Sequence, residues 1–383
     1  MSDICLCRFC GGDFFQPALL NYPEAPQSAQ GFLDDLDQPD ALVDLKIHQC
    51  AGCGLVQHSL LPVSYHRDVI RAIAYSTEMA AFRAEQLNKW IQHFDLQNKN
   101  VLEIGCGKGE YLDLLMKSGA HKVFGLENAE PSIQLASQRG FNVKQGYLSL
   151  GFSNPWPFKF EAFAIFSFLE HWPDLKGSLN NLHTFLNDGA CGLIEVPNFD
   201  FIIKNGLYSE FTTDHIFYFD KNSLRTVLEL CGFEVQSIES IWHDYILSAQ
   251  VKKRTRLDAN DFKTKQADMV AQLCFFTGQF QPQEVVVWGA GHQALAVISL
   301  ARLQDKISHV IDSAEFKQNK YTPASHLLIK PPESLLQDNP KAIVIMAAAY
   351  SDEVATTILQ KYSSVKNIAI LREDHLEIIR DER

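Results

Sequence analysis

The chain has 383 residues, enough for two or three domains, and 46% of them are hydrophobic, an ordinary share for a globular protein. Its formal net charge is −12, and no run of basic residues interrupts it. An acidic chain of this kind is poorly suited to bind a phosphate backbone, so we expect no nucleic-acid partner.

The sequence also indicates the cellular compartment in which we expect the protein. The N-terminus has no charged segment followed by an apolar core, and no stretch approaches the roughly 18 apolar residues of a membrane span. We therefore expect a soluble, cytoplasmic protein with no membrane partner. Nine cysteines in a chain of this length do not suggest a disulfide scaffold, and several are clustered at metal-binding spacing.

Residues 1–65 predict a small zinc-binding module. They contain two C-x-x-C pairs, each followed by glycine, at Cys7, Cys10, Cys50 and Cys53. Four thiolates at about 2.3 Å from one metal make a closed, structural zinc site. So short a segment has too little core to fold well alone, and metal would supply the missing stability. Cys5 and His48 flank the pairs, and Cys5 could replace Cys7. The alternative is four free, buried cysteines.

Residues 66–98 form a connector with helical spacing of apolar residues from Val69 to Leu96. The pattern is interrupted at Tyr75-Ser76-Thr77. A substrate lid could sit there, just before the next domain. A plain turn between two helices explains the break at least as well.

Residues 99–250 open on the stretch that organises the chain. The apolar run Asn100–Ile104 predicts a buried parallel strand, which ends in alternate glycines at 105, 107 and 109 and passes into a helix. The glycines let the backbone turn sharply and approach a ligand. The pattern V-L-E-I-G-C-G-x-G resembles the first motif of class I S-adenosylmethionine (SAM) methyltransferases, whose glycine loop curls under the methionine part of SAM. A NAD-type fingerprint places its third glycine one residue later.

The next strand, Lys122–Glu127, supports SAM binding. A carboxylate at its tip can accept both ribose hydroxyls, and Glu127 lies about twenty residues after the loop, as in other nucleoside-binding sheets. A helix-capping acid on a generic doubly wound fold is the alternative. Residues of the loop and of the strand ends are the expected SAM contacts: Glu103, Gly105, Cys106, Gly107, Gly109, Glu127, Asn128, Gln145, Gly146 and Phe168.

The other elements of this domain alternate between strands and helices. We predict strands at 100–105, 122–127, 141–145, 160–168 and 192–196, and helices at 108–118, 130–138 and 221–231. Alternation implies a parallel sheet with helices on both faces, and ligands bind at the carboxyl ends of its strands. Asp220 is expected to cap the last helix, Gly232 to end it, and a closing hairpin to follow at 233–252.

Residues 251–282 predict a charged linker helix, and residues 283–383 predict a second, smaller Rossmann-like domain. Its first strand ends in Gly289-Ala290-Gly291, and its second strand ends in Asp312. The segment is short for a full dinucleotide fold. Binding of part of a phosphate-carrying substrate at the helix N-terminus is therefore favoured over NAD.

The three parts together resemble the sugar C-methyltransferases, which act on nucleotide-linked 4-keto deoxysugars. The resemblance covers nearly the whole chain and rests on the cysteine pairs at Cys7–Gly11 and Cys50–Leu55, the SAM motif, and the loop at Trp288–Gly291. It implies an α/β fold with a class I SAM methyltransferase sheet, an N-terminal zinc module and a Rossmann-like C-terminal substrate-binding domain. It also implies SAM and structural zinc as cofactors, and a nucleotide sugar as the small-molecule substrate.

The family's catalytic base is a histidine in a stretch like Y-H-E-H-x-x-Y-F, which Thr212–Phe219 matches. His215 and the aromatic pair are kept, but Thr212 replaces the tyrosine and Asp214 replaces the glutamate. The resemblance implies His215 as the base. Asp214 beside it is a candidate orienting partner, although the side chains of adjacent residues often point apart. His215 as a packing histidine near SAM is the alternative. The family's C-terminal loop lysine is also replaced, with Gln293 near its place.

Methylation of carbon requires an enolate, so a base must take the proton beside a ketone and donors must hold the enolate oxygen. His171 and Tyr75 are the candidate enolate stabilisers. His171 could equally be a structural histidine that caps the next helix.

Two other functions stay open. Ordinary small-molecule O-methyltransferases also carry E/D-H-x-x-x-F before the same helix, so an O- or N-methyltransferase acting on a sugar or another metabolite is the alternative. A non-enzymatic scaffold is disfavoured by the intact glycine loop and Glu127. The sequence does not identify the sugar, the nucleotide, the methylated position or the oligomeric state.

Overall fold

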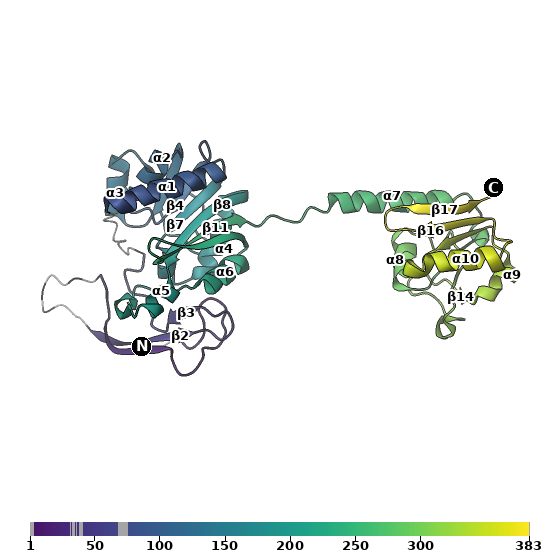
Figure 1. The fold of residues 1–383 in the computed structure, drawn as a ribbon, viewed down its shortest axis with the longest axis horizontal. Helices are drawn as coiled ribbons and strands as arrows, with labels where there is room; N and C mark the ends of the chain where they lie inside the picture. The colour runs from purple at the N-terminus through teal and green to yellow at the C-terminus, as the bar shows by residue number, and fades with distance from the viewer. Residues whose placement is uncertain are drawn as a thin grey trace. The chain divides into compact units, whose positions relative to one another are not determined.

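The computed structural model describes residues 4–382 except 31, 33, 34, 36, 38–40 and 68–75. The chain divides into two compact units, Met1–Arg256 and Leu257–Arg383 (Figure 1). Each unit contains a mixed sheet whose central strands are parallel and whose two faces are covered by helices, as the alternation of predicted strands and helices indicates.

The large sheet of the first unit has, among the described residues, the strand order β10-β11-β8-β7-β4-β5-β6. Its strands are β4 (Asn100–Ile104), β5 (Lys122–Glu127), β6 (Asn142–Gln145), β7 (Phe160–Phe166), β8 (Leu186–Pro197), β10 (Phe233–Ile241) and β11 (Ile246–Lys253). Neighbours from β8 to β6 run parallel, while β11 and β10 are antiparallel additions. The predicted parallel sheet and its closing hairpin are confirmed.

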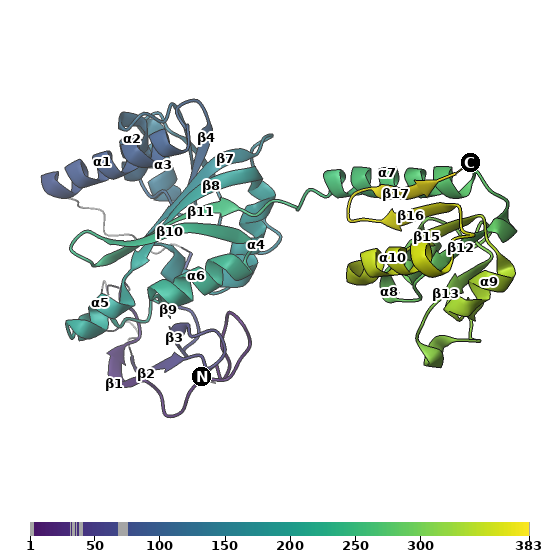
Figure 2. The same cartoon turned by 45° about the vertical axis from the view of Figure 1, so that its right-hand side comes forward.

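Helices cover both faces of this sheet (Figure 2), and alternate residues of its central strands pack in two different cores. The helices that pack on this sheet are α1 (Thr77–His93), α2 (Glu110–Lys117), α3 (Glu130–Gln138), α4 (Leu175–Phe185) and α6 (Lys221–Leu230). Leu102 and Phe163 pack in the core that contains α4 and α6. Val101 and Ala164 pack in the core that contains α1 and α2. A strand buried on both faces gives the continuous apolar run seen in the sequence.

Helix α6 begins and ends where the sequence predicts. The Asp220 carboxylate accepts the Ser223 N–H, and the Ser223 hydroxyl accepts the Asp220 N–H, so a capping box closes the first turn. Gly232 follows the helix with φ of 81°, a conformation that glycine adopts at low cost.

A buried ion pair fixes α1 to the sheet. Arg83 of α1 and Glu195 of β8 are 1% and 0% exposed, and the Arg83 guanidinium donates to the Glu195 carboxylate. Gln86 and Ser248 donate to the other carboxylate oxygen, over 2.5 and 3.0 Å. The Arg83 guanidinium also lies 5.5 Å from the centre of the Tyr111 ring. Packing and charge together therefore set the position of α1.

The N-terminal residues form a smaller antiparallel sheet with the order β1-β2-β3-β9 in the described part of the chain. Its strands are β1 (Leu20–Pro26), β2 (Leu42–Gln49), β3 (Val56–His58) and β9 (Phe217–Tyr218). Val56 pairs with Tyr218, so a strand that follows both C-x-x-C pairs joins a strand that follows His215. Leu45, Ile47 and Phe199 of the short helix α5 (Phe199–Lys204) share the core of this sheet. No local sequence pattern indicates this pairing.

The second unit has a six-stranded sheet, β14-β13-β12-β15-β16-β17, over residues 257–382. Its strands are β12 (Val285–Trp288), β13 (His309–Ile311), β14 (Ile329–Lys330), β15 (Ala342–Ile345), β16 (Asn367–Leu371) and β17 (Leu376–Asp381). Its helices are α7 (Asn260–Thr277), α8 (His292–Leu300), α9 (Leu335–Asp338) and α10 (Ser351–Lys361). Helices α7 and α8 cover one face and α9 and α10 the other. The predicted second Rossmann-like fold is confirmed.

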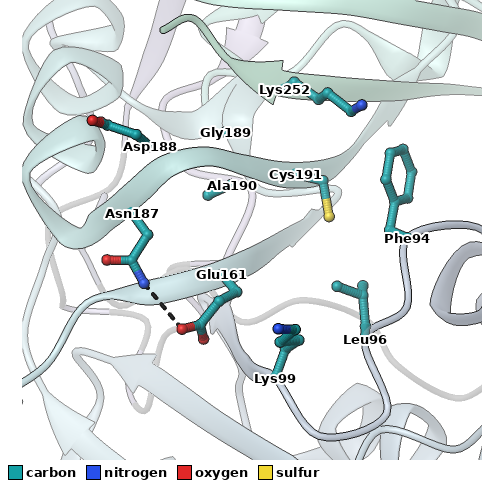
Figure 3. A pocket seen from close by; sticks show the side chains of 10 residues that line it. All are labelled: Phe94, Leu96, Lys99, Glu161, Asn187, Asp188, Gly189, Ala190, Cys191 and Lys252. Atoms are coloured by element: carbon teal, nitrogen blue, oxygen red, sulfur yellow. Dashed lines mark hydrogen bonds between the residues drawn. The ribbon is translucent and has the colours of Figure 1, made fainter.

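A cavity of about 270 Å³ lies at the amino-terminal ends of β4, β7 and β8 (Figure 3). Inside it, Glu161 accepts from the Asn187 amide over 3.0 Å and from the Asn100 N–H over 2.9 Å. The Lys252 ammonium lies 5.7 Å from the centre of the Phe94 ring. The glycine loop lies at the opposite ends of these strands, so this cavity is not part of the candidate site described next.

Among the described residues, no helix combines the length and the apolar character that crossing a bilayer requires.

Candidate functional site

The glycine loop leaves the carboxyl end of β4 in a left-handed conformation, with φ of 72° at Gly105. A Cβ added there would lie 2.5 Å from the ring of Phe168, which follows β7. Only glycine therefore lets this aromatic ring pack directly on the loop. The structure brings together two residues that the sequence assigned to one cofactor site.

Glu127 is held across the same loop. Its carboxylate accepts the N–H groups of Gly107, Asn128 and Ala129 over 2.8, 2.8 and 2.9 Å. The next strand end is close, because Gly146 N–H donates to the Glu127 carbonyl over 2.8 Å and the Gln145 amide donates to the Asn128 carbonyl over 3.2 Å. A carboxylate fixed at this edge fits the acceptor that two ribose hydroxyls require.

The other residues predicted to contact the cofactor differ in how far they are buried in the protein. The Cys106 thiol packs against β5, since a Cβ on Gly125 would lie 2.4 Å from its sulfur. Glu103 lies within β4 and is fully buried. Gly109 begins α2 with φ of 83°, and a Cβ there would lie 2.7 Å from the Phe141 ring. Gly105, Gly107 and Glu127 lie at the carboxyl ends of the strands, and Phe168, Asn128, Gln145 and Gly146 lie beside them.

Two histidines face each other beside this edge. His171 ends a short 3₁₀ turn after β7 (Leu169–His171), and its ring centre lies 4.9 Å from that of His215 at 72°. The Nδ1–H of His171 donates to the Asp214 carbonyl over 2.8 Å. This tautomer leaves Nε2 as an acceptor, 4.0 Å from a carboxylate oxygen of Glu170.

Both imidazoles are neutral at pH 7. Burial lowers the pKa of His171 to about 3, with the nearby His215 adding to the shift. Burial also lowers the pKa of His215 to about 4, against a hydrogen bond to the Glu210 main chain that raises it. A neutral imidazole with one nitrogen tied to a carbonyl keeps the lone pair of the other nitrogen as a proton acceptor, and the lowered pKa makes it a weaker base than an exposed histidine.

Asp214 does not face His215. Its carboxylate accepts the Tyr65 hydroxyl over 2.6 Å, and the described residues show no hydrogen bond or ion pair between it and the His215 ring. The orienting contact expected from the sequence is therefore absent. Tyr75, the second candidate enolate stabiliser, lies outside the described residues.

The segment that carries His215 is fixed from two sides. His58 N–H donates to the Ile216 carbonyl over 3.1 Å, and His58 Nε2 lies 3.1 Å from the Thr213 carbonyl. From the other side, Ile216 N–H donates to the Glu170 carbonyl over 2.9 Å. Sequence reasoning missed both His58 and Tyr65, because neither stands in a motif and each meets its partner across about 150 residues of chain.

The four predicted zinc ligands form one cluster. Their sulfur atoms all lie within 4.8 Å of one another, with 3.7 Å between Cys7 and Cys53 and 3.4 Å between Cys10 and Cys50. Tetrahedral zinc with bonds of about 2.3 Å spaces its sulfurs by about 3.8 Å, so the donor set fits this ion. The hydrogen bond between the two thiols lowers the pKa of Cys7 to about 4 and raises the pKa of Cys53, so one thiolate is favoured within this pair.

The flanking candidates lie apart from this cluster. Cys5 is exposed, and the His48 ring stacks on Phe14 at 4.8 Å. Amide hydrogens point at the clustered sulfurs, as from Gly52 to Cys50 over 3.3 Å and from the Gln57 side chain to Cys7 over 3.0 Å. Such donors stabilise thiolates and orient them toward a shared ion.

The second unit repeats part of this arrangement. The Asp312 carboxylate accepts the N–H groups of Ala290 and Ala314 over 2.8 and 2.9 Å. Unlike Glu127, it also binds an ammonium group, that of Lys317, over 2.9 Å. The carboxylate that accepts a hydrogen bond from the second glycine loop therefore already has a charged partner.

Two family models match the chain. A methyltransferase domain matches residues 79–238, and a C-methyltransferase C-terminal domain matches residues 250–368. No curated protein is similar enough to match.

Several solved structures resemble part of the chain. An S-adenosylmethionine dependent methyltransferase from Mesorhizobium loti is 12% identical, covers 44% of this chain and 99% of its own, and has a TM-score of 0.36. The plantazolicin methyltransferase BpumL is 15% identical, covers 47% and 87%, and scores 0.39. The amino pentose methyltransferase CalS10 from Micromonospora echinaspora is 14% identical, covers 48% and 100%, and scores 0.37.

These identities are too low to transfer a substrate. The family models say more, since both describe methyltransferase domains and the first spans the sheet that carries the glycine loop and Glu127. On that basis the chain is a SAM-dependent methyltransferase with the class I α/β fold, joined to a C-methyltransferase C-terminal domain.

Proposed function

We propose that this methyltransferase transfers the methyl group of SAM to a carbon atom of a nucleotide-linked keto-deoxysugar. The match of the second unit to a C-methyltransferase C-terminal domain supports carbon as the acceptor. The resemblance of the three-part sequence to sugar C-methyltransferases supports the substrate. SAM would be held by the loop at Gly105 and Gly107 and by Glu127, and zinc by the four clustered cysteines.

The observation that carries the proposal is the His171–His215 pair, in which His171 is buried, His215 is half-buried and both imidazoles are neutral. His215 takes the proton from the carbon beside the ketone, and the electron pair of that C–H bond moves into the enolate. The imidazolium that forms then lies beside the enolate and stabilises its negative charge. The enolate carbon attacks the SAM methyl group, and the C–S bond breaks to leave S-adenosylhomocysteine.

His171 has a different part in this scheme from the one that the sequence suggested. Its Nδ1–H is occupied by the Asp214 carbonyl, so its Nε2 accepts a hydrogen bond rather than donating one. We assign it to accept a hydroxyl of the sugar. Stabilisation of the enolate oxygen by Tyr75 stays a prediction.

An O- or N-methyltransferase on a sugar or another metabolite is the competing function. A neutral His215 could also take a proton from a hydroxyl or an ammonium group. That chemistry needs no enolate, so it predicts no exchange of carbon-bound hydrogen with solvent.

Exchange into deuterium oxide therefore separates the two functions. Thymidine diphosphate 4-keto-6-deoxyglucose is incubated with the enzyme and S-adenosylhomocysteine in deuterium oxide, and proton NMR follows the carbons beside the ketone. We expect enzyme-dependent exchange that falls at least about 100-fold in His215→Asn, the usual scale of general-base catalysis. His121→Asn, at an exposed histidine, is the matched control and should exchange like wild type.

Exchange that persists in His215→Asn would overturn the role of His215. A methylated oxygen or nitrogen in the product, together with no exchange in wild type, would support the competing function.

A further inference from the structure

Tyr65 links the N-terminal module to the catalytic segment. Its hydroxyl donates to the Asp214 carboxylate over 2.6 Å. The same oxygen accepts the N–H groups of Ala29 and Gln30 over 2.9 and 3.0 Å, and the Ser28 hydroxyl donates to it over 2.8 Å. One half-buried phenol thus joins the backbone beyond β1 to the residue that precedes His215.

Asp214 links Tyr65 to His171, because its side chain contacts one residue and its main chain the other. Its carboxylate binds Tyr65, and its carbonyl accepts the Nδ1–H of His171 over 2.8 Å. The residue itself is 4% exposed, so its two polar ends are fixed at the same time in a dry environment. The His171 ring in turn lies 4.9 Å from the His215 ring.

The N-terminal module holds the neighbouring residues as well. His58 contacts the carbonyls of Thr213 and Ile216, and β3 pairs with β9 directly after them. These contacts fix the main chain around His215, while Tyr65 is the contact to the Asp214 side chain. Loss of the Tyr65 hydroxyl should therefore change the geometry of the histidine pair without breaking the pairing of β3 with β9.

We propose that Tyr65 is a positioning residue for methyl transfer, which sets the Asp214 main chain and through it the orientation of His171 beside His215. The N-terminal module, which contains the four clustered cysteines, then contributes to the geometry of the reaction and not only to folding. The catalytic meaning of this role rests on the proposed function of the two histidines, whereas the positioning itself does not.

Tyr65→Phe removes the hydroxyl and keeps the ring. We expect kcat to fall about 10-fold or more, because small displacements of a catalytic group cost rate steeply, while the Kd for SAM stays within about twofold of wild type. Tyr22→Phe is the matched control. Tyr22 is a half-buried tyrosine of β1 whose ring stacks on Phe211, and its loss of a hydroxyl should change neither value.

A second variant separates positioning from folding. Tyr65→Phe leaves the buried Asp214 carboxylate without its hydroxyl donor, which costs stability. Adding Asp214→Asn removes the buried charge, so the melting temperature of the double variant should rise back toward wild type. The double variant should nevertheless keep the reduced kcat. Recovery of kcat together with the melting temperature would mean that Tyr65 acts only on stability.

Imidazole nitrogen NMR gives a readout that needs no substrate. In wild type we expect His171 as the Nδ1–H tautomer, and we expect its resonances to shift or broaden in Tyr65→Phe while those of His309 in the second unit stay unchanged. If wild type fails to turn over the keto sugar but His171 still responds, the proposed function fails and the positioning role survives. Unchanged His171 resonances with unchanged kcat would overturn the positioning role.

Discussion

The Glu127 carboxylate accepts the N–H of Gly107 over 2.8 Å, and this bond ties the end of β5 to the glycine loop after β4. In the second unit the Asp312 carboxylate accepts the N–H of Ala290 in the same way. The difference lies in the charge around them. Asp312 has the Lys317 ammonium at 2.9 Å, whereas the described residues place no ion pair on Glu127. Each carboxylate accepts three hydrogen bonds from residues that the structure describes, but only Asp312 has a charged partner among its donors. This difference supports our proposal that Glu127, and not Asp312, binds the ribose hydroxyls of SAM.

Glu127→Gln should weaken SAM binding. The amide keeps the shape but loses the charge, and hydrogen bonds to a charged acceptor are worth about 1.5–3 kcal/mol. We expect the Kd for SAM, measured by calorimetry, to rise about 10- to 100-fold. Glu130→Gln, an exposed acid in the first turn of α3, is the control and should bind SAM like wild type. Asp312→Asn should leave a stoichiometry of one SAM per chain, and a change there would assign SAM binding to the second unit.

The cysteine cluster should hold one zinc ion per chain. We expect Cys10→Ser and Cys7→Ser to lose bound zinc, measured by elemental mass spectrometry, and to melt at a lower temperature, because metal binding contributes folding free energy in such small modules. Cys5→Ser is the matched control, since Cys5 is exposed and outside the cluster. Zinc retained in Cys7→Ser but lost in Cys5→Ser would exchange the roles of these two residues.

Much of the fold follows from local sequence. The strands β4, β5 and β7 are apolar runs buried on both faces. Asp220 marks the start of α6, and Gly232 marks its end. Each is a signal carried by residues adjacent in the chain. The class of the sheet and the position of the glycine loop could therefore be predicted without a structure.

The missed features are ones that no local pattern encodes. Strand β1 contains two prolines, which argue against a strand in the middle of a sheet, but β1 lies at an edge of its sheet where proline is tolerated. The pairing of β3 with β9, and the contact of Tyr65 with Asp214, join residues about 150 positions apart. The motif around His215 predicted that Asp214 would orient it, but the main chain turns the carboxylate toward Tyr65 instead.

Stability of the first unit should fall as the pH drops below neutral. Burial holds the pKa of His171 at about 3, whereas an unfolded chain has a histidine pKa of about 6.5. Between these values the unfolded state binds a proton that the native state does not, so the unfolding free energy rises with pH. The stabilisation is complete above about pH 6.5 and is lost progressively below it.

His171→Asn isolates this contribution. From pH 7 to pH 5 we expect wild type to lose about 2 kcal/mol more unfolding free energy than the variant, at about 1.4 kcal/mol per pH unit within the window. Urea unfolding of the full chain at the two pH values measures the difference. His121→Asn, at an exposed histidine, should keep the wild-type slope. Equal slopes in wild type and His171→Asn would mean that His171 is protonated in the native state at pH 5.

The buried Arg83–Glu195 pair gives the sharpest stability test. Arg83→Met leaves the Glu195 carboxylate charged at a site that is 0% exposed, and an uncompensated buried charge costs about 3–5 kcal/mol. Adding Glu195→Gln removes that charge and keeps an oxygen that can accept from Gln86 and Ser248. The double variant should therefore recover much of the unfolding free energy lost by the single one, measured as urea unfolding of the full chain.

The exposed pair of Arg225 and Glu229 on α6 supplies the control. Their charged atoms lie 3.3 Å apart in solvent, and surface pairs at this spacing contribute at most about 0.5 kcal/mol. Arg225→Met should thus be close to wild type. A double variant of Arg83 and Glu195 no more stable than Arg83→Met would show that shape, through the guanidinium packed on Tyr111, holds α1 to the sheet more than charge does.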